Sequence, residues 1–510
     1  DGLSVIGRRK LKKKVSFRRL IFVFSFFSLY LCTMGNNRII GREEEQRTLQ
    51  KCYESNDPQL VIVYGRRRVG KTFLVEQFFD RHFDFQFVGA YKQTREMQLS
   101  NFADAMRYAT GESVSVPADW KEAFTMLRSH LEQLPSTRRK VVYFDEMPWM
   151  DTPKSDFLPE FEWFWNSWGA KQDDLLFIVC GSATTWITKK IFNNKGGLFN
   201  RHARRIFVRP FCLNEVEQFL VSRQIQWSRY DIAECYMTMG GIPYYLNLLD
   251  PEYNYNDNID RIFFRKKGDL WDEFSHLYDT LFNNSENYLR VVDALSKKRM
   301  GLTRGEILRE TGLPDNGAFS DILKDLAESD FIRPYNYFGK KKQDMLYQLS
   351  DYYTLFYYRF VKDNYGRDEH FWNHTIDNPS RRAWAGLAFE QLCKDHIEQI
   401  KRSISIAGVL SEHSSWFSKK EEADHGTQID MLIDRRDRVI NICEMKFSVN
   451  EFTIDKDYDA VLRNRMATFK QETKTNKALH ITMITTYGVK RNIYSNIVQS
   501  QVLLDDLFES

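Results

Sequence analysis

The chain lacks most of the features that place a protein in a specialised class. No tract is rich in proline, serine or glutamine and no segment repeats, so the composition, 43% hydrophobic and 28% charged, is that of a globular protein of roughly three domains. The seven cysteines are scattered and never form a C-x-x-C pair, which argues against a disulfide framework and a zinc ribbon. Because the net charge is only +4, contacts with nucleic acid would have to come from local patches.

The first 33 residues carry a net charge of +7, from eight Lys and Arg against one Asp, so the rest of the chain sums to −3. A basic stretch followed by a short apolar run imitates a signal peptide. The run is shorter than the roughly 20 residues that cross a bilayer, and no small-x-small cleavage site follows it. We interpret residues 1–33 as a non-native upstream extension, with a membrane anchor as the alternative. We expect a cytoplasmic protein without stable membrane association.

The segment LVIVYGRRRVGKTFLVEQFF, residues 60–79, combines a glycine-containing loop with elements typical of a nucleotide site. An apolar run predicts a buried parallel strand at 60–64, and an amphipathic pattern predicts a helix after the loop. Glycines let backbone N–H groups converge on phosphate oxygens, and the helix N-terminus adds the positive end of its dipole. We predict that the loop binds ATP, with Lys71 neutralising the β- and γ-phosphates and Thr72 as a ligand of Mg²⁺. The predicted loop residues are Gly65, Arg66, Arg67, Arg68, Val69, Gly70, Lys71 and Thr72.

A second apolar run, residues 141–144, ends in Asp145 and Glu146. In open α/β sheets, ligands bind at the carboxyl ends of the strands, so this acidic pair is expected beside the phosphate loop. Asp145 would hold Mg²⁺ through water, and Glu146 would polarise the water that attacks ATP.

Two further positions are candidates for a role in hydrolysis. A third predicted strand, within residues 174–187, ends in Ser182, whose hydroxyl could report on the γ-phosphate, although a simple turn explains it nearly as well. Arg201 begins a basic cluster and is a candidate arginine finger, supplied in cis or by a neighbouring copy in a homo-oligomer. Arg204 and Arg205 compete for that role, and a solvated basic loop is the alternative.

Several short motifs occur in a defined order: IIGREEEQRTL at 39–49, then YGRRRVGKT, YFDEMPW, CGSATTW, LFNR and, at 240–246, GGIPYYL. Together they resemble the archaeal-type ATPases of the AAA+/STAND lineage. The resemblance implies an α/β fold with a P-loop NTPase parallel sheet, a helical lid, a winged-helix connector and a second, restriction-endonuclease-like α/β domain. In that family the first motif packs near the adenine, and the stretch at 241–243 senses the nucleotide.

Domain boundaries follow from these motifs and from the changes in pattern. After the extension at 1–33 we predict the ATPase core at 34–210, the helical lid at 211–286, the winged helix at 287–350, a helical linker at 351–380 and the nuclease-like domain at 381–510.

Residues 287–350 predict three helices followed by a hairpin, the order of a winged helix. The helix that would read DNA carries Asp315, Asp321, Asp325 and Glu328 against only Lys324, a poor surface for phosphates. The hairpin turn at 340–342 is basic enough for a backbone contact. A relay or protein-docking role is therefore favoured over reading of a DNA sequence.

The stretch GTQIDMLIDRRDRVINICEMKFS, residues 426–448, predicts an antiparallel hairpin whose turn is centred near Asp437. Counting outward from that turn places Asp430 opposite Glu444, give or take one residue, and alternation places Lys446 on the face of Glu444. The two carboxylates could hold a divalent cation, and Lys446 could help to deprotonate a metal-bound water. An ion pair at the end of a strand is the alternative.

A helical pattern at 381–400 adds Glu390 to this set. The order Glu390, Asp430, Glu444-x-Lys446 resembles the PD-(D/E)XK nuclease fold, which also forms the C-terminal part of the ATPase family named above. The resemblance implies a metal site of Glu390, Asp430 and Glu444 with Lys446 as a catalytic residue. Because all four positions are retained, a competent site is favoured over a scaffold that has lost catalysis.

These features lead to three hypotheses, all with ATP and Mg²⁺ at the phosphate loop. In the first, the nucleotide state gates a Mg²⁺-dependent phosphodiesterase that acts on DNA. In the second, the protein is an ATP-driven switch whose C-terminal domain only binds a partner or nucleic acid. The third, a sequence-specific regulator that uses the winged helix, is disfavoured by the acidity of its reading helix.

Overall fold

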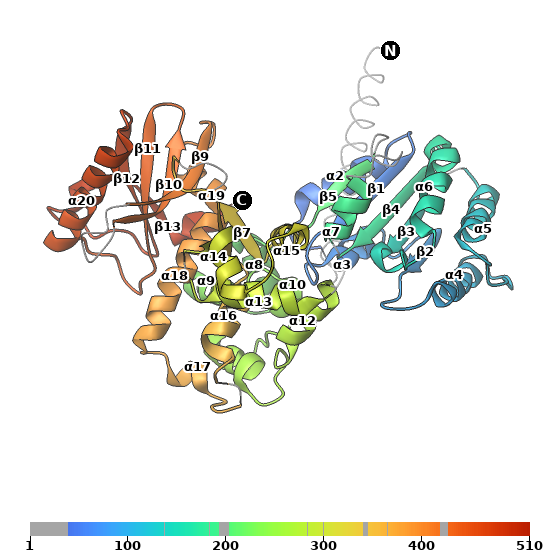
Figure 1. The fold of residues 1–510 in the computed structure, drawn as a ribbon, viewed down its shortest axis with the longest axis horizontal. Helices are drawn as coiled ribbons and strands as arrows, with labels where there is room; N and C mark the ends of the chain where they lie inside the picture. Colours follow the sequence, from blue (N-terminus) through green and yellow to red (C-terminus); the bar gives the residue numbers. More distant parts are fainter. Residues whose placement is uncertain are drawn as a thin grey trace, which may run out of the picture.

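The computed structural model describes residues 39–509, apart from 193–202, 340–344, 419–426 and positions 137, 183, 283, 299 and 365. An N-terminal parallel sheet, a central set of helices and a C-terminal mixed sheet follow one another along the chain. The two larger sheets lie at opposite ends of the molecule with the central helices between them (Figure 1). Within the described residues, no helix is both long and apolar enough to cross a bilayer.

The N-terminal sheet has five parallel strands in the order β2-β3-β4-β1-β5. They are β1 (Gln59–Tyr64), β2 (Phe85–Val88), β3 (Lys140–Asp145), β4 (Leu175–Gly181) and β5 (Ala203–Phe207). The three strands predicted from apolar runs are β1, β3 and β4, and the predicted parallel α/β sheet is confirmed. Strands β1, β3 and β4 are buried because helices cover both faces of the sheet.

Two groups of helices cover these faces. Residues of α2 (Glu43–Tyr53) and α3 (Lys71–Phe78) share one buried cluster with Val61 and Val63 of β1. Residues of α4 (Arg95–Thr110), α5 (Trp120–Gln133) and α6 (Phe157–Ser167) share the other with Leu60 and Ile62 of the same strand. Alternate side chains of one strand therefore enter opposite cores.

The central region is helical and ends in a small sheet. Its elements are α8 (Leu213–Ser222), α9 (Arg229–Met239), α10 (Pro243–Leu246), α11 (Tyr255–Ile259), α12 (Glu273–Leu281), α13 (Ser285–Ser296), β6 (Leu302–Thr303), α14 (Arg304–Thr311), α15 (Gly317–Glu328), β7 (Ile332–Tyr335), β8 (Leu346–Leu349), α16 (Tyr352–Phe356) and α17 (Phe371–His374). The expected succession of three helices and a hairpin is present as α13, α14, α15 and β7–β8, and β6 pairs with β8.

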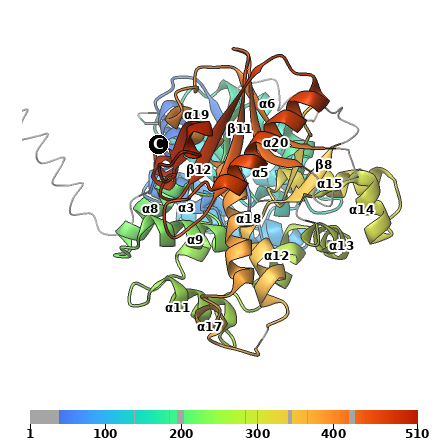
Figure 2. The ribbon, with the colours of Figure 1, turned by 90° about the vertical axis from the view of Figure 1, so that its left-hand side faces the viewer.

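The C-terminal sheet mixes two strand directions in the order β13-β12-β11-β10-β9. Strands β9 (Ser411–Phe417), β10 (Gln428–Arg435) and β11 (Val439–Lys446) are antiparallel, whereas β12 (Ala478–Thr485) and β13 (Val498–Leu503) run parallel to β11. The helices of this region are α18 (Pro379–Asp395), α19 (Ile397–Ser403) and α20 (Lys456–Thr473). Figure 2 shows this sheet with α20 and α18 beside it.

One buried hydrophobic cluster connects the three regions. It includes Val63 of β1, Tyr353 of α16, Phe389 of α18 and Phe508 near the C-terminus. Outside this cluster, the ring of Tyr230 in α9 stacks on that of Phe447, just after β11, with centroids 4.6 Å apart. The regions are therefore packed directly against one another.

Candidate functional site

The phosphate loop joins β1 to α3 and depends on glycine at both ends. Gly65 has φ of +147°, and a Cβ atom there would lie 2.2 Å from the carbonyl oxygen of Val208. Gly70 has φ of +86° and precedes the first residue of α3. These are conformations that side chains rarely adopt. The loop therefore brings its backbone amides to the N-terminus of α3, where the helix dipole favours an anion.

Three side chains predicted to act on the nucleotide meet at this loop. The ammonium group of Lys71 is buried and donates to the carbonyl oxygen of Arg66 across 2.9 Å. The hydroxyl of Thr72 donates to Oδ2 of Asp145 across 2.8 Å. The tips of β1 and β3 are thus close together, although β4 lies between them in the sheet. A hydroxyl oxygen and a carboxylate oxygen side by side are ligands that Mg²⁺ prefers, so these residues fit the metal.

Glu146 follows β3 in a left-handed conformation, with φ of +47°. Its carboxylate accepts hydrogen bonds from Ser182, from the hydroxyl at 2.7 Å to Oε1 and from the backbone N–H at 3.2 Å to Oε2. Ser182, expected to report on the γ-phosphate, is a hydrogen-bond partner of Glu146. The reason is that β3 and β4 are neighbours in the sheet, so the residues that follow them meet directly.

The arginines of the loop, predicted to bind the cofactor, are held by the central helices. Arg66 forms an ion pair of 2.5 Å with Asp351, Arg67 donates to the hydroxyl of Thr280, and Arg68 forms an ion pair with Glu273. Burial would lower the pKa of Arg66, but the adjacent carboxylate of Asp351 outweighs this effect and raises it. These side chains connect the loop to α12 and to the start of α16, which the sequence alone did not indicate.

A cavity of about 470 Å³ lies beside the loop and has the size of a nucleotide site. Its apolar lining comes from both sides of the loop and from the central helices: Ile39, Ile40, Phe73, Phe211, Phe219, Pro243 and Tyr244. The motifs at 39–49 and 240–246 supply four of these residues, as the resemblance implies. Phe73, Phe211 and Phe219 were missed, because an aromatic residue in or beside a helix gives no sign that it faces a ligand.

Arg201, the candidate arginine finger, lies outside the described residues. Its competitors Arg204 and Arg205 lie on β5 with exposed side chains. The guanidinium of Arg205 lies 3.9 Å from the ring centre of Phe192.

The C-terminal hairpin has the predicted register. β10 and β11 are antiparallel with Met431 opposite Cys443, so the next pair outward is Asp430 and Glu444. Glu444 is 5% exposed, and its Oε2 accepts a hydrogen bond of 2.8 Å from the hydroxyl of Tyr458. Lys446 lies on the same face, with its ammonium group 4.9 Å from the ring centre of Tyr458.

Glu444 also forms an ion pair with Arg465 of α20. Burial would lower the pKa of Arg465, but the charge of Glu444 and its hydrogen bond raise it above its usual value. A positive side chain therefore already neutralises the carboxylate that was predicted to bind a metal. This partner could not be recognised from the sequence, because Arg465 is one of several basic residues on α20.

Glu390 is not brought together with this pair. Its helix, α18, contributes Phe389 and Cys393 to the cluster that contains Cys443, whereas Glu444 lies on the other face of β11, which α20 covers. Among the residues that the structure describes, no three His, Cys, Asp or Glu side chains are grouped to hold a metal ion. The predicted set of three carboxylates is therefore not assembled as expected, because α18 packs on the face of β11 that carries Cys443 and not on the face of Glu444.

Comparisons with known proteins agree with the geometry of the phosphate loop. Residues 39–249 match the model of a family described as an ATPase domain predominantly from Archaea. Protein MJECL04 of Methanocaldococcus jannaschii is 22% identical over 392 residues, which are 76% of this chain and 83% of that protein. ATP-binding protein MJ0423 of the same organism is 44% identical over 41 residues, which are 8% of this chain and 70% of that protein.

Solved structures give a more distant similarity. The Walker-type ATPase of Pyrococcus abyssi has 19% sequence identity and a TM-score of 0.48, covering 63% of this chain and 97% of that one. The ORC2 protein of Aeropyrum pernix has 12% identity and a TM-score of 0.42, covering 72% of this chain and 97% of that one. The assignment rests on the family match and on the loop itself. Residues 39–249 resemble an ATPase domain of this predominantly archaeal family.

Proposed function

We propose that the protein is an ATP-driven switch, in which ATP binding and hydrolysis at the phosphate loop rearrange the central helices and, through them, the C-terminal domain. The observation that carries this proposal is the buried ion pair between Arg66 in the loop and Asp351 at the start of α16. A loop that only bound nucleotide would have no need for a partner so far along the chain.

The chemistry at the loop follows from its own side chains. Lys71 neutralises phosphate charge, and Glu146, held by Ser182, accepts a proton from the attacking water. Thr72 and Asp145 would hold Mg²⁺, which neutralises charge that develops on the phosphates. Arg201 is our candidate for a finger supplied within the chain or by a second copy.

The transmission path begins at the loop arginines. If the loop shifts when the γ-phosphate is lost, its two ion pairs transmit the movement. The pair of Arg66 with Asp351 displaces α16, and the pair of Arg68 with Glu273 displaces α12. Asp351 also caps α16, because its Oδ2 accepts from the backbone N–H of Thr354 at 2.9 Å. α16 lies in the buried cluster that reaches α18, so its movement is passed to the C-terminal domain.

We assign the central three helices and hairpin to a winged helix that docks on the ATPase core, and we keep the predicted boundary of 287–350. Lys189 of the core lies 3.0 Å from Asp321 and 3.5 Å from Asp325 of α15. The helix that would read DNA is therefore engaged within the chain. This contact supports the relay role over sequence-specific regulation.

The C-terminal domain, 381–510, is best explained as a binding module for a partner or for nucleic acid. The ion pair of Glu444 with Arg465 and the separate position of Glu390 favour this function. A Mg²⁺-dependent nuclease of the PD-(D/E)XK type that acts on DNA is the second candidate. The hairpin register and the shared face of Glu444 and Lys446 favour it.

Hydrogen exchange in two nucleotide states tests the switch. Glu146→Gln would hold ATP without hydrolysing it, and we expect segments 351–360 and 440–447 to exchange at different rates with ATP and with ADP. Asp351→Asn should retain nucleotide binding and lose this difference, whereas Asp104→Asn, which alters an exposed ion pair with Arg107, should keep it. Equal exchange in both states of the Glu146→Gln protein would rule out the switch.

A further inference from the structure

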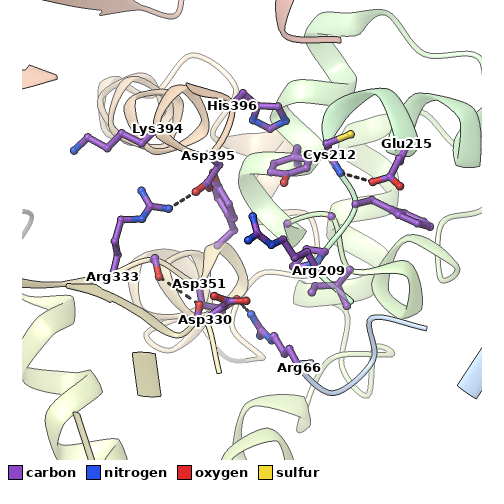
Figure 3. A pocket seen from close by; sticks show the side chains of 18 of the residues that line it. Arg66, Arg209, Cys212, Glu215, Asp330, Arg333, Asp351, Lys394, Asp395 and His396 are labelled. Atoms are coloured by element: carbon purple, nitrogen blue, oxygen red, sulfur yellow. Dashed lines mark hydrogen bonds and ion pairs between the residues drawn. The ribbon is translucent and has the colours of Figure 1, made fainter. Parts of the chain in front are cut away.

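A second cavity, of about 710 Å³, lies where the ATPase core, the central helices and the start of the C-terminal domain meet (Figure 3). Its lining includes Arg66 of the phosphate loop, residues 209–212 after β5, residues 332–334 of β7 and residues 394–398, where α18 is followed by α19. Arg42 and Phe211 line both this cavity and the nucleotide cavity. The guanidinium of Arg42 lies 4.5 Å from the ring centre of Phe211, so these two residues form the wall between the cavities.

Two arginines in the lining have hydrogen-bond donors that nothing in the described structure uses. Arg66 is 4% exposed; one of its nitrogens pairs with Asp351, but Nε and Nη2 are buried without a partner among the described residues. Arg333 pairs with Asp395 through Nη2, and its Nη1 is likewise buried without a described partner. Buried donors are normally satisfied, because leaving them unpaired costs free energy. An acceptor on a ligand in the cavity would satisfy these groups.

Arg209 adds a third guanidinium from another element. It follows β5 and lines the cavity, and within the described residues it makes no hydrogen bond or ion pair. Its guanidinium lies 5.7 Å from the centre of the Phe207 ring. Figure 3 shows that Arg66, Arg209 and Arg333 enter the cavity from different parts of the chain. The arrangement is that of a site assembled from several segments.

The carboxylates of the lining do not all compete for these donors. Asp351 accepts from Arg66 and from the backbone of Thr354, and Asp395 accepts from Arg333 and from the hydroxyl of Tyr352. Asp330 lines the same cavity, and among the described residues its carboxyl makes no hydrogen bond or ion pair. A hydroxyl group on a ligand would give the carboxyl of Asp330 a partner.

We propose that this cavity binds a small molecule that carries a phosphate group and hydroxyl groups. The phosphate oxygens accept from Arg66, Arg209 and Arg333, since a planar guanidinium matches phosphate geometry with two parallel hydrogen bonds. A hydroxyl of the ligand bonds to Asp330. The volume lies within the range of about 300–1,000 Å³ that is usual for small-molecule sites.

The position of Arg66 couples this site to the ATPase loop. Its side chain reaches into the second cavity, and its carbonyl oxygen accepts from Lys71 in the first. A phosphate bound in the second cavity therefore alters the affinity for ATP, and ATP alters the affinity for that phosphate by the same factor. Only this coupling rests on the proposed function; binding in the second cavity does not require hydrolysis.

The test uses the full chain saturated with ADP and Mg²⁺, so that the nucleotide loop is filled. Inorganic phosphate and ribose 5-phosphate are titrated separately by equilibrium dialysis. We expect saturable binding of one equivalent, with ribose 5-phosphate tighter if the hydroxyl contact with Asp330 is made. Arg209→Gln should weaken binding at least tenfold, as expected for loss of a hydrogen bond to a charged group.

Arg436→Gln is the matched control, because Arg436 is an exposed arginine in the turn between β10 and β11 and does not line the cavity. It should leave the affinity for both probes unchanged, and retained ADP binding shows that each variant is folded. If neither probe binds saturably, or if Arg209→Gln binds both as tightly as the parent chain, the site does not exist. If ADP itself fails to bind, the loop assignment is wrong, but a dependence of phosphate binding on Arg209 would still support the second site.

Discussion

Arg66 and Asp351 are 285 positions apart in the chain and form an ion pair of 2.5 Å with both side chains buried. The first belongs to the loop that receives phosphate, and the second begins the helix that follows the central hairpin. Such a pair couples two distant elements because neither charge tolerates burial without the other. The relationship makes the central helices part of the nucleotide site rather than a separate attachment.

Removing one member of this pair should destabilise the protein strongly. We expect Asp351→Ala to lower the free energy of unfolding by about 3–5 kcal/mol, because it leaves the buried guanidinium of Arg66 without its partner. Denaturation with urea measures the change. Asp104→Ala removes an exposed pair with Arg107 and should cost less than about 1 kcal/mol. Equal losses for both variants would mean that the buried pair is not special.

Glu146 and Ser182 should act on the rate of hydrolysis and not on nucleotide affinity. We expect Glu146→Gln to slow ATP turnover by about 10²–10⁴-fold, the usual contribution of a positioned general base. Ser182→Ala should slow it less, because Glu146 loses its orientation but keeps its charge. Lys71→Ala should abolish binding itself. Phosphate release and calorimetry with ATP separate these effects, and unaltered turnover in Glu146→Gln would remove this residue from the mechanism.

The C-terminal domain should bind without cutting. We expect no cleavage of single- or double-stranded DNA by the parent chain with Mg²⁺ or Mn²⁺, whether or not ATP is present, because Glu444 is already neutralised by Arg465. If cleavage does occur, Glu444→Gln should abolish it and leave ATP hydrolysis intact, whereas Glu451→Gln, an exposed residue of the same domain, should not. That outcome would replace the binding module with the nuclease.

Stability should fall in mild acid partly because of His396. Burial lowers the pKa of this side chain, whose Nδ1 donates to the carbonyl of Leu392 while Nε2 accepts from the backbone N–H of Leu213. Below the unfolded-state pKa of about 6.5, the unfolded chain takes up a proton that the folded chain does not, so stability is lost as pH falls. His396→Gln should reduce this loss in urea titrations between neutral pH and pH 5, and His413, whose pKa burial also lowers, leaves a remaining slope in both proteins.

The elements of the phosphate site could be predicted because their signals are local. The strand, loop and helix at 59–78 lie in one continuous stretch, and the rule that ligands bind at the carboxyl ends of parallel strands brings Asp145 to Thr72. The hairpin register was predictable for a similar reason, since a short charged turn fixes which residues oppose each other.

Side-chain partners from distant segments could not be predicted in the same way. Asp351, Thr280 and Glu273 bind the loop arginines only because the central helices pack against the ATPase core. Glu390 was grouped with Glu444 from sequence order. The face of the sheet that a helix covers depends, however, on how the chain passes from strand to helix, and residue spacing does not show this. Arg465 was overlooked because one basic residue on a helix resembles any other.

The stack of Tyr230 on Phe447 joins α9 to the residue that follows Lys446. Separating the two stacked rings would expose a face of each ring to water. The contact therefore opposes separation of α9 from the end of β11. A ligand of the C-terminal hairpin, as proposed above, would therefore be coupled to α9 through this contact. The coupling acts in both directions. A molecule bound beside Lys446 would oppose movement of α9 and so slow the nucleotide cycle.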